Sequence, residues 1–269
     1  MILNAVLAPL AAIALAGGGG PPSHVVKVVA TDYHLAMPAS LPAGPTSFQV
    51  VNHGREPHQV YLVQLRDGRT MTDLVSALRA GGPPPAWAVD AGGPNAVDPG
   101  GTSTVTTVRL VPGTYAALCV IPSPDGTPHV MKGMINSFTV TPVSNAAAVE
   151  ARPDRTVTMV DYGYDLSAPL TAGPHQIEVR NAGKQSHELV LARLAPGKTV
   201  KDLAAWVEKM DGPPPASFLG GVSPLAPGGR NLLSVSLTPG HYAFLCFLPD
   251  AKDGKPHIAH GMGQEFEVK

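Results

Sequence analysis

Short runs of β-branched and aromatic residues, bounded by Pro and Gly turns, recur along most of the chain. This pattern is typical of β-strands that pack one face against a core. In Thr102–Leu110, for example, Thr and Val alternate as in a half-buried strand. The other predicted strands are Val25–Val29, Ser47–Val51 and Gln59–Val63, then Thr156–Val160, Gln176–Arg180, Glu188–Ala192 and Leu232–Leu237. Seven or eight short strands in each half predict an all-β protein built of antiparallel sandwiches.

Each half also contains one stretch in which the apolar residues have helical spacing. In the second half Leu203, Trp206, Val207 and Met210 lie at positions i, i+3, i+4 and i+7 after Thr199. In the first half a shorter apolar set, Leu74, Val75 and Leu78, precedes a Gly pair. We therefore expect one short helical insertion in each half.

Composition narrows the fold and function classes further. The chain has 269 residues with 29 Gly and 29 Pro, a density that breaks helices and excludes a helical bundle. Charged residues make up 14%, against roughly 25% in an ordinary domain. A hydrophobic content of 44% and a net charge of −1 argue against disorder. The chain has no cluster of Lys and Arg residues, so its charge pattern gives no indication of nucleic-acid binding.

An internal repeat organises the chain. Six features of the first half recur in the second with offsets between 127 and 130 residues. For example, Asn52-x-Gly54-x3-His58 recurs as Asn181-x-Gly183-x3-His187, and Asp32-Tyr33 recurs as Asp161-Tyr162. The sequence therefore predicts a tandem duplication, with domain 1 at 24–142, a linker at 143–154 and domain 2 at 155–269.

The beginning of the chain has the pattern of an export signal. Residues 1–16 are apolar apart from Asn4 and end in Ala14-Leu15-Ala16, an A-x-A cleavage pattern. The alternative is a short membrane anchor, but the run falls short of the roughly 20 residues that span a bilayer. We expect a signal peptide over 1–16, a periplasmic or secreted protein, and no membrane span after cleavage.

Both repeats keep a His, a Cys, a His and a Met at matching positions. An isolated His on a strand is usually structural and an isolated Met usually fills a core. All four residues are nevertheless retained together, and the only two cysteines of the chain are equivalent. We therefore predict two metal-ligand sets: His58, Cys119, His129 and Met134 in the first repeat, and His187, Cys246, His257 and Met262 in the second. His260 is an alternative ligand close to His257.

Two imidazoles, a thiolate and a weak thioether match a trigonal copper site with a long axial bond. Such a site suits both Cu(I), which prefers soft sulfur, and Cu(II), which prefers nitrogen. Zinc is the alternative metal, because Cys and His bind it well. A Met ligand is poor for zinc, so the set favours copper, with two ions per chain.

The same residues resemble a known family. The segment Asn52–His58 resembles the first-ligand segment of plastocyanin-type blue copper proteins, and Gly113-x-Tyr115-x3-Cys119 with Pro128-His129-x4-Met134 resembles their C-terminal ligand loop. This resemblance covers about residues 25–142 and 155–269. It implies a cupredoxin fold, a Greek-key sandwich, in each repeat, with type 1 copper on the four named residues. The loop between Cys and the second His is longer here, and we expect it to hold that His less rigidly.

Three functions are weighed for such a chain. The leading hypothesis is an electron-transfer protein, not an enzyme, with a redox partner such as a cytochrome. A copper oxidase or nitrite reductase would need further ligands of the His-x-His kind, and the chain contains no such pair. The third hypothesis is a copper buffer or chaperone, or a metal-free cupredoxin-like sandwich that binds a partner protein.

The apolar neighbours of the second ligand His suggest where a partner would dock. Val130 and Met131 follow His129, and Ile258 follows His257. In the resembling family the ring edge of this His reaches the surface through an apolar patch. We therefore expect an exposed ring edge in both repeats, with packing over the metal as the alternative role for Val130 and Ile258.

Overall fold

The structure, a computed structural model, describes residues 24–143, 152–210 and 212–269. The predicted signal peptide and most of the predicted linker lie outside these residues. Within them, no helix is both long and apolar enough to cross a membrane.

Eight strands form one sheet, in the order β11-β10-β12-β15-β7-β4-β1-β2. The four strands from the first repeat are β1 (His24–Thr31), β2 (His34–Ala36), β4 (Gly44–Asn52) and β7 (Thr102–Leu110). The four from the second repeat are β10 (Arg155–Val160), β11 (Gly163–Leu166), β12 (Gly173–Asn181) and β15 (Arg230–Leu237). In both repeats the first strand pairs in parallel with a later one, β1 with β4 and β10 with β12.

Nine strands form the second sheet, in the order β17-β16-β13-β14-β6-β5-β8-β9-β3. Those from the first repeat are β3 (Ser40–Pro42), β5 (Tyr61–Leu65), β6 (Ala88–Gly92), β8 (Gly113–Leu118) and β9 (Ile135–Thr141). Those from the second repeat are β13 (His187–Leu194), β14 (Ala216–Leu225), β16 (Gly240–Leu245) and β17 (Gly263–Val268). The predicted strands are all present, and the predicted all-β class is confirmed.

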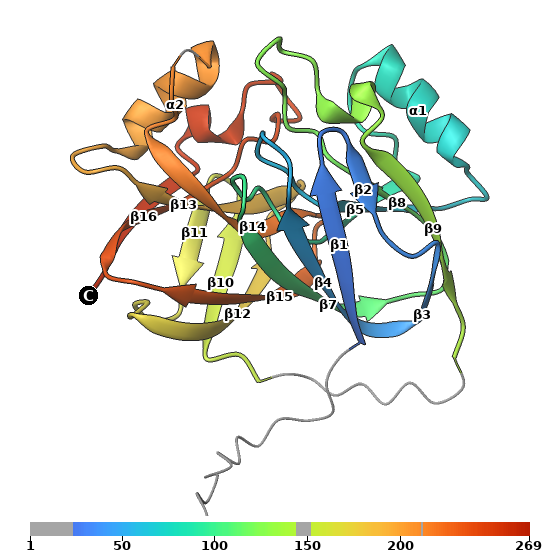
Figure 1. The fold of residues 1–269 in the computed structure, drawn as a ribbon, viewed down its shortest axis with the longest axis horizontal. Helices are drawn as coiled ribbons and strands as arrows, with labels where there is room; N and C mark the ends of the chain where they lie inside the picture. Colours follow the sequence, from blue (N-terminus) through green and yellow to red (C-terminus); the bar gives the residue numbers. More distant parts are fainter. Residues whose placement is uncertain (1–23, 144–151, 211) are drawn as a thin grey trace, which may run out of the picture.

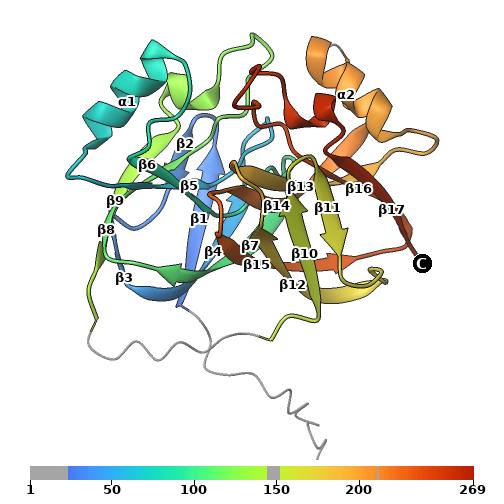
Figure 2. The same cartoon turned by 180° about the vertical axis from the view of Figure 1, so that it is seen from behind.

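The core lies between the two sheets. In the first repeat Phe48 and Val50 of the eight-stranded sheet pack into one buried cluster with Leu62 and Phe138 of the nine-stranded sheet. A corresponding cluster in the second repeat includes Ile177 and Phe244. The strands therefore form a two-layered sandwich in each repeat, as the alternating pattern predicts (Figures 1 and 2).

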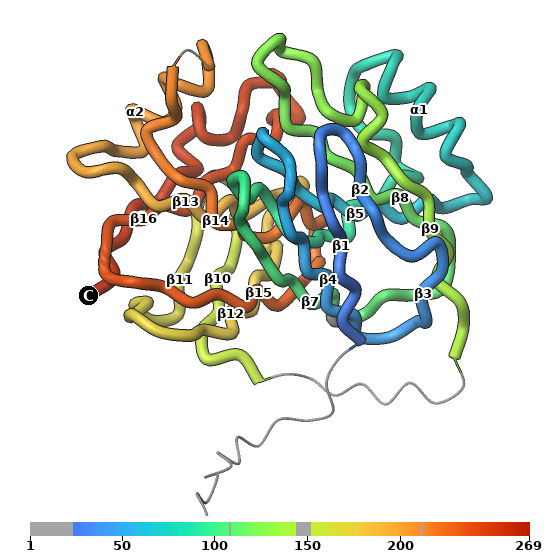
Figure 3. The backbone as a smooth tube through the Cα atoms, viewed as in Figure 1, coloured from blue at the N-terminus to red at the C-terminus, as the bar shows by residue number. Residues whose placement is uncertain are grey.

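The two repeats join edge to edge, so both sheets continue through the whole molecule (Figure 3). In one sheet β7 pairs with β15 over four residue pairs, from Thr104 with Ser234 to Thr107 with Asn231. In the other, β6 meets β14 through the pair Ala91 and Leu225, and the segment that follows β6 continues this pairing. A line of backbone hydrogen bonds therefore crosses the junction in each layer.

Each repeat has one α-helix between its first His and its Cys. These are α1 (Met71–Ala80) and α2 (Val200–Lys209), which lie at opposite corners of one edge of the molecule (Figures 1 and 2). Thr70 and Thr199 cap them, each accepting a hydrogen bond from the backbone N–H of an Asp at the third helical position. Leu74 and Leu203 are the buried residues of the two helices. The predicted helical insertions are confirmed.

Candidate metal centres

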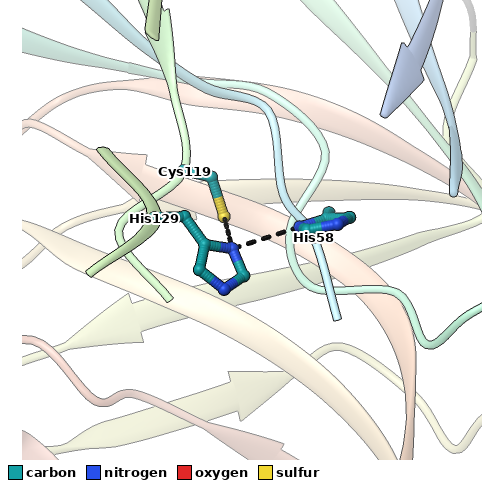
Figure 4. A group of neighbouring side chains, drawn as sticks. All are labelled: His58, Cys119 and His129. Atoms are coloured by element: carbon teal, nitrogen blue, oxygen red, sulfur yellow. Dashed lines mark hydrogen bonds between the residues drawn. The ribbon is translucent and has the colours of Figure 1, made fainter. Parts of the chain in front are cut away.

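The first ligand set is assembled from two loops. His58 lies between β4 and β5, Cys119 directly follows β8, and His129 begins a 3-10 turn, η1 (His129–Lys132). All three residues are fully buried, at 0% exposure. Figure 4 shows the three side chains pointing toward one another. The structure thus brings together three of the residues predicted from the first repeat.

Three donor atoms converge in this group. The Nδ1 atoms of His58 and His129 lie 3.1 Å apart, and the Cys119 Sγ lies 3.4 Å from the His129 Nδ1. A metal bound to imidazole nitrogen at about 2.05 Å and to thiolate at about 2.3 Å, with angles of about 100–110°, would separate these atoms by about 3.1–3.6 Å. The spacing of the donors therefore fits one metal ion.

The other nitrogen of each ring is bonded to a carboxylate. His58 Nε2 lies 2.8 Å from Asp32 Oδ1, and His129 Nε2 lies 2.8 Å from Glu56 Oε2. A carboxylate only accepts, so each Nε2 carries the proton and donates it. In the neutral rings the lone pairs of the two Nδ1 atoms then face each other at 3.1 Å. Such an arrangement is unfavourable without a cation between them and is typical of metal-ligating histidines.

Met134 lies beside these ligands in the buried core. It belongs to the same apolar cluster as Cys119 and is 0% exposed. Its backbone N–H donates to the His129 carbonyl at 3.0 Å, and its carbonyl accepts from the Cys119 N–H at 3.1 Å. The chain is therefore closed around the predicted four residues by hydrogen bonds of the methionine itself.

The long loop between Cys119 and His129 is folded back on itself. Pro122 and Pro128 face each other in a bridge, and the N–H of His129 donates to the Ile121 carbonyl at 2.9 Å. The N–H of Val130 donates to the Cys119 carbonyl at 2.7 Å. The added residues therefore form a paired turn of their own, and the expectation that the longer loop holds the His less rigidly stays a prediction.

The second repeat builds the same group. The Nδ1 atoms of His187 and His257 lie 3.1 Å apart, and the Cys246 Sγ lies 3.3 Å from the His257 Nδ1. His187 Nε2 donates to Asp161 Oδ1 at 2.9 Å. Met262 is fully buried in the same cluster as Cys246. All eight predicted residues therefore lie in two buried groups, one in each repeat.

Burial controls the ionisation of several of these groups. It raises the pKa of the Cys119 thiol to about 12 and raises that of Cys246 as well. Burial, together with the charge of His187, lowers the pKa of His257 to about 4, and burial also lowers that of His58. Both thiols are therefore protonated at neutral pH without metal, whereas these two imidazoles are neutral.

The second ligand His does not reach the surface. The side chain of His129 is 0% exposed and that of His257 is 1% exposed, so the expected exposed ring edge is wrong for both repeats. Val130 is buried, whereas Met131 is 45% exposed. The carboxylate of Glu56 covers the outer nitrogen of His129. This covering is possible because Glu56 precedes the first ligand on a neighbouring loop.

His260 stands apart from the second ligand group. Its Nε2 bonds Asp253 Oδ1 at 3.1 Å, and its side chain is 30% exposed. It belongs instead to a group with Asp250 and Asp253. The structure therefore does not place His260 as a substitute for His257.

Sequence reasoning missed the carboxylates behind the ligands. Asp32 and Asp161 recur at the same offset as the ligand histidines, so the repeat itself carried their signal. Glu56 has no such signal, because its counterpart in the second repeat is Gln185.

No family model matches the chain, and no curated protein matches it. Among solved structures, auracyanin B is 26% identical, with a TM-score of 0.32, over 46% of this chain and 93% of that one. An auracyanin from Roseiflexus castenholzii is 22% identical, with a TM-score of 0.29, over 46% of this chain and all of that one. A blue copper oxidase from Nitrosomonas europaea is 13% identical, with a TM-score of 0.29, over 92% and 86%. These TM-scores are low, so the chemistry of the two centres is derived from their own residues.

Proposed function

We propose that this chain is an exported electron-transfer protein with one copper ion in each of two cupredoxin-like units. The observation that carries the proposal is the convergence of two imidazole Nδ1 atoms and one Cys sulfur at metal-ligand spacing, twice in one chain. The donor set combines soft sulfur with nitrogen, which suits copper in both oxidation states. Bound copper would supply the one-electron redox chemistry.

The protein's own part is to hold the ligands in place. Each His ring is fixed by its Nε2 or by packing, and each Cys lies in a closed apolar cluster. A rigid, dry ligand set changes little when the charge of the ion changes. This property favours a carrier over a copper buffer, which must release its ion readily.

An enzyme is the less favoured function. Multicopper catalysis requires additional histidine-rich ligand sets, and the sequence contains no His-x-His pair. Among the described residues, the remaining group of potential ligands is Asp250, Asp253 and His260, of which only one is a histidine. We accordingly propose that the copper-loaded protein does not turn over oxygen or nitrite.

Metal content and the visible spectrum of the purified protein test this function. We expect two copper ions per chain and a thiolate-to-copper absorption band that disappears on reduction and returns on oxidation. Cys119→Ala and Cys246→Ala should each remove one ion and part of the band. A protein that binds no copper, or that binds it without reversible reduction, would overturn the carrier function, and oxygen or nitrite consumption above the free-copper background would indicate an enzyme.

A further inference from the structure

The two centres differ in the group behind the second histidine. In the first repeat Glu56 Oε2 lies 2.8 Å from His129 Nε2. In the second, the counterpart of Glu56 is Gln185, and the His257 Nε2 is buried without a hydrogen-bond partner. Its nearest carboxylate oxygen, on Asp250, is 3.8 Å away, which is too long for a hydrogen bond.

The second repeat also has a carboxylate near its second ligand His, but it belongs to a different position of the chain. Asp250 stands where the first repeat has Ser123, since each follows the first proline of the ligand loop. In each repeat the tyrosine of the Asp-Tyr pair donates a hydrogen bond to this carboxylate. Tyr33 donates to Glu56 Oε1 at 2.8 Å, and Tyr162 donates to Asp250 Oδ2 at 2.5 Å. Gln185 also donates to Asp250 Oδ2, at 2.9 Å. In the second repeat, therefore, the Asp250 carboxylate accepts hydrogen bonds from the tyrosine and the amide and none from the ligand ring.

We propose that this exchange makes the two copper centres unequal, with Glu56 as a positioning residue that lowers the reduction potential of the first centre below that of the second. This inference rests on the proposed function. A carboxylate that accepts the N–H of a ligand imidazole makes the ring a stronger donor. A stronger donor stabilises Cu(II) more than Cu(I), because the higher charge gains more from it.

Unequal centres give electron flow a direction within the chain. With copper held by both ligand sets, this difference would favour transfer of one electron from Cu(I) in the first repeat, leaving Cu(II), to Cu(II) in the second, giving Cu(I). The transfer would involve the electron alone, because the Nε2 proton of His129 is already donated to Glu56. The protein would therefore accept electrons at the first repeat and deliver them from the second.

One further carboxylate must be weighed in the second repeat. Glu188, next to His187, accepts hydrogen bonds from Asn95 Nδ2 at 2.9 Å and from the backbone N–H of Phe247 at 3.0 Å. Its carboxylate makes no hydrogen bond to a ligand side chain, so its charge would act on the metal through space. The Glu56 bond, which acts directly on a ligand, is the larger effect, and Glu188→Gln measures the smaller one.

Each potential can be measured by spectroelectrochemistry in a full-length chain whose other cysteine is replaced by alanine. We expect a lower potential for the first centre, and Glu56→Gln should raise it. A tenfold loss of preference for Cu(II) over Cu(I) corresponds to a rise of about 59 mV. Asp67→Asn, which removes an exposed charge at the far end of β5, should leave the potential unchanged. The reciprocal exchange Gln185→Glu with Asp250→Ser should lower the potential of the second centre.

The outcomes separate this inference from the function on which it rests. If the chain binds no copper, the proposed function fails. If it binds two reducible coppers with equal potentials, or if Glu56→Gln leaves the first potential where it was, only the inequality is overturned. Should Glu56→Gln lose its copper altogether, the reciprocal exchange in the second repeat decides, and an unchanged potential there overturns the inference.

Discussion

Gly54 lies against the ring of His58, so close that a Cβ on it would come within 3.0 Å of the ring Nε2. The same Cβ would also meet Asp32 Oδ1, the atom that accepts the Nε2–H. In the second repeat a Cβ on Gly183 would lie 2.6 Å from both His187 Nε2 and Asp161 Oδ1. The glycine in each Asn-x-Gly motif therefore leaves the space in which the carboxylate reaches the ligand ring.

Gly54→Ala should damage the first centre and spare the second. The added methyl group would separate His58 from Asp32, and loss of such a partner typically weakens metal binding about 10–100-fold. Copper titration of the variant, followed by the absorption of each centre, checks this. Gly163→Ala is the matched control, because its Cβ would make only an ordinary contact with Val160. Equal copper affinity in Gly54→Ala and in the parent chain would contradict this role of the glycine.

The strands were predictable where alternation and turns agree. Thr102–Leu110 has the predicted bounds, because its run of β-branched residues is bounded by Gly101 and by Pro112-Gly113. β14 was missed, because it contains Gly220, Gly221 and Pro224 and shows no alternation. Its position depends on partners from both repeats, with hydrogen bonds from Asn95 to Gly221 and from Gly220 to Ala96. Pairing of that kind depends on the tertiary fold and leaves no periodic pattern in the sequence.

The ligands were predictable for a different reason from the strands. The duplication marks residues that share a role, and it therefore selected the His, Cys and Met positions from among common core residues. The carboxylate near the second ligand His belongs to Glu56 in the first repeat and to Asp250, on a different loop, in the second. Neither residue is repeated, so the duplication could not mark either one. The burial of His129 could not be predicted either, because it depends on a contact with Glu56, which lies 73 residues earlier in the chain.

Asn52 should be essential to the loop that carries His58. It is fully buried, and its Nδ2 donates to the carbonyls of Glu56 at 2.8 Å and Val97 at 2.9 Å. Its Oδ1 accepts the N–H of Gly54 at 2.8 Å. Asn52→Ala removes the partner of the Glu56 carbonyl and of the Gly54 N–H, which costs about 1–3 kcal/mol for each group that stays buried, whereas the Val97 carbonyl keeps its bond from the His58 N–H. Denaturant unfolding should show this loss of stability, together with weaker copper binding at the first centre.

The equivalent variant provides a control for Asn52→Ala. Asn181 makes the same contacts with Gln185, Leu225 and Gly183. Asn181→Ala should therefore lose a similar amount of stability but weaken copper binding at the second centre instead. If both variants affected both centres equally, the loops would not act independently.

Asn95→Ala should change the second centre although Asn95 belongs to the first repeat. Its side chain donates to Glu188 Oε2, and the other oxygen of Glu188 holds the N–H of Phe247, which follows Cys246. Loss of a hydrogen bond to a buried carboxylate costs about 1.5–3 kcal/mol when that group is charged. We expect a shift in the absorption band of the second centre and an unchanged band from the first. A shift confined to the first centre would contradict this connection between the repeats.

Copper binding should release one proton from each thiol. Burial raises the pKa of Cys119 to about 12 and raises that of Cys246, so both are protonated in the metal-free protein at pH 8. The metal binds the thiolate, so each proton must leave when copper enters. Affinity should therefore rise about tenfold per pH unit at each centre, as long as the thiol stays protonated. The free energy of unfolding of the metal-free protein should change with pH in the opposite direction. Because burial raises the thiol pKa, the contribution of the thiol to this free energy is present at low pH and is lost as pH rises above about 9. Titration in two buffers of different ionisation enthalpy measures the protons released, and Cys119→Ser should release one fewer than the parent chain. An equal release from the two proteins would mean that Cys119 is not a ligand or is already ionised before copper binds.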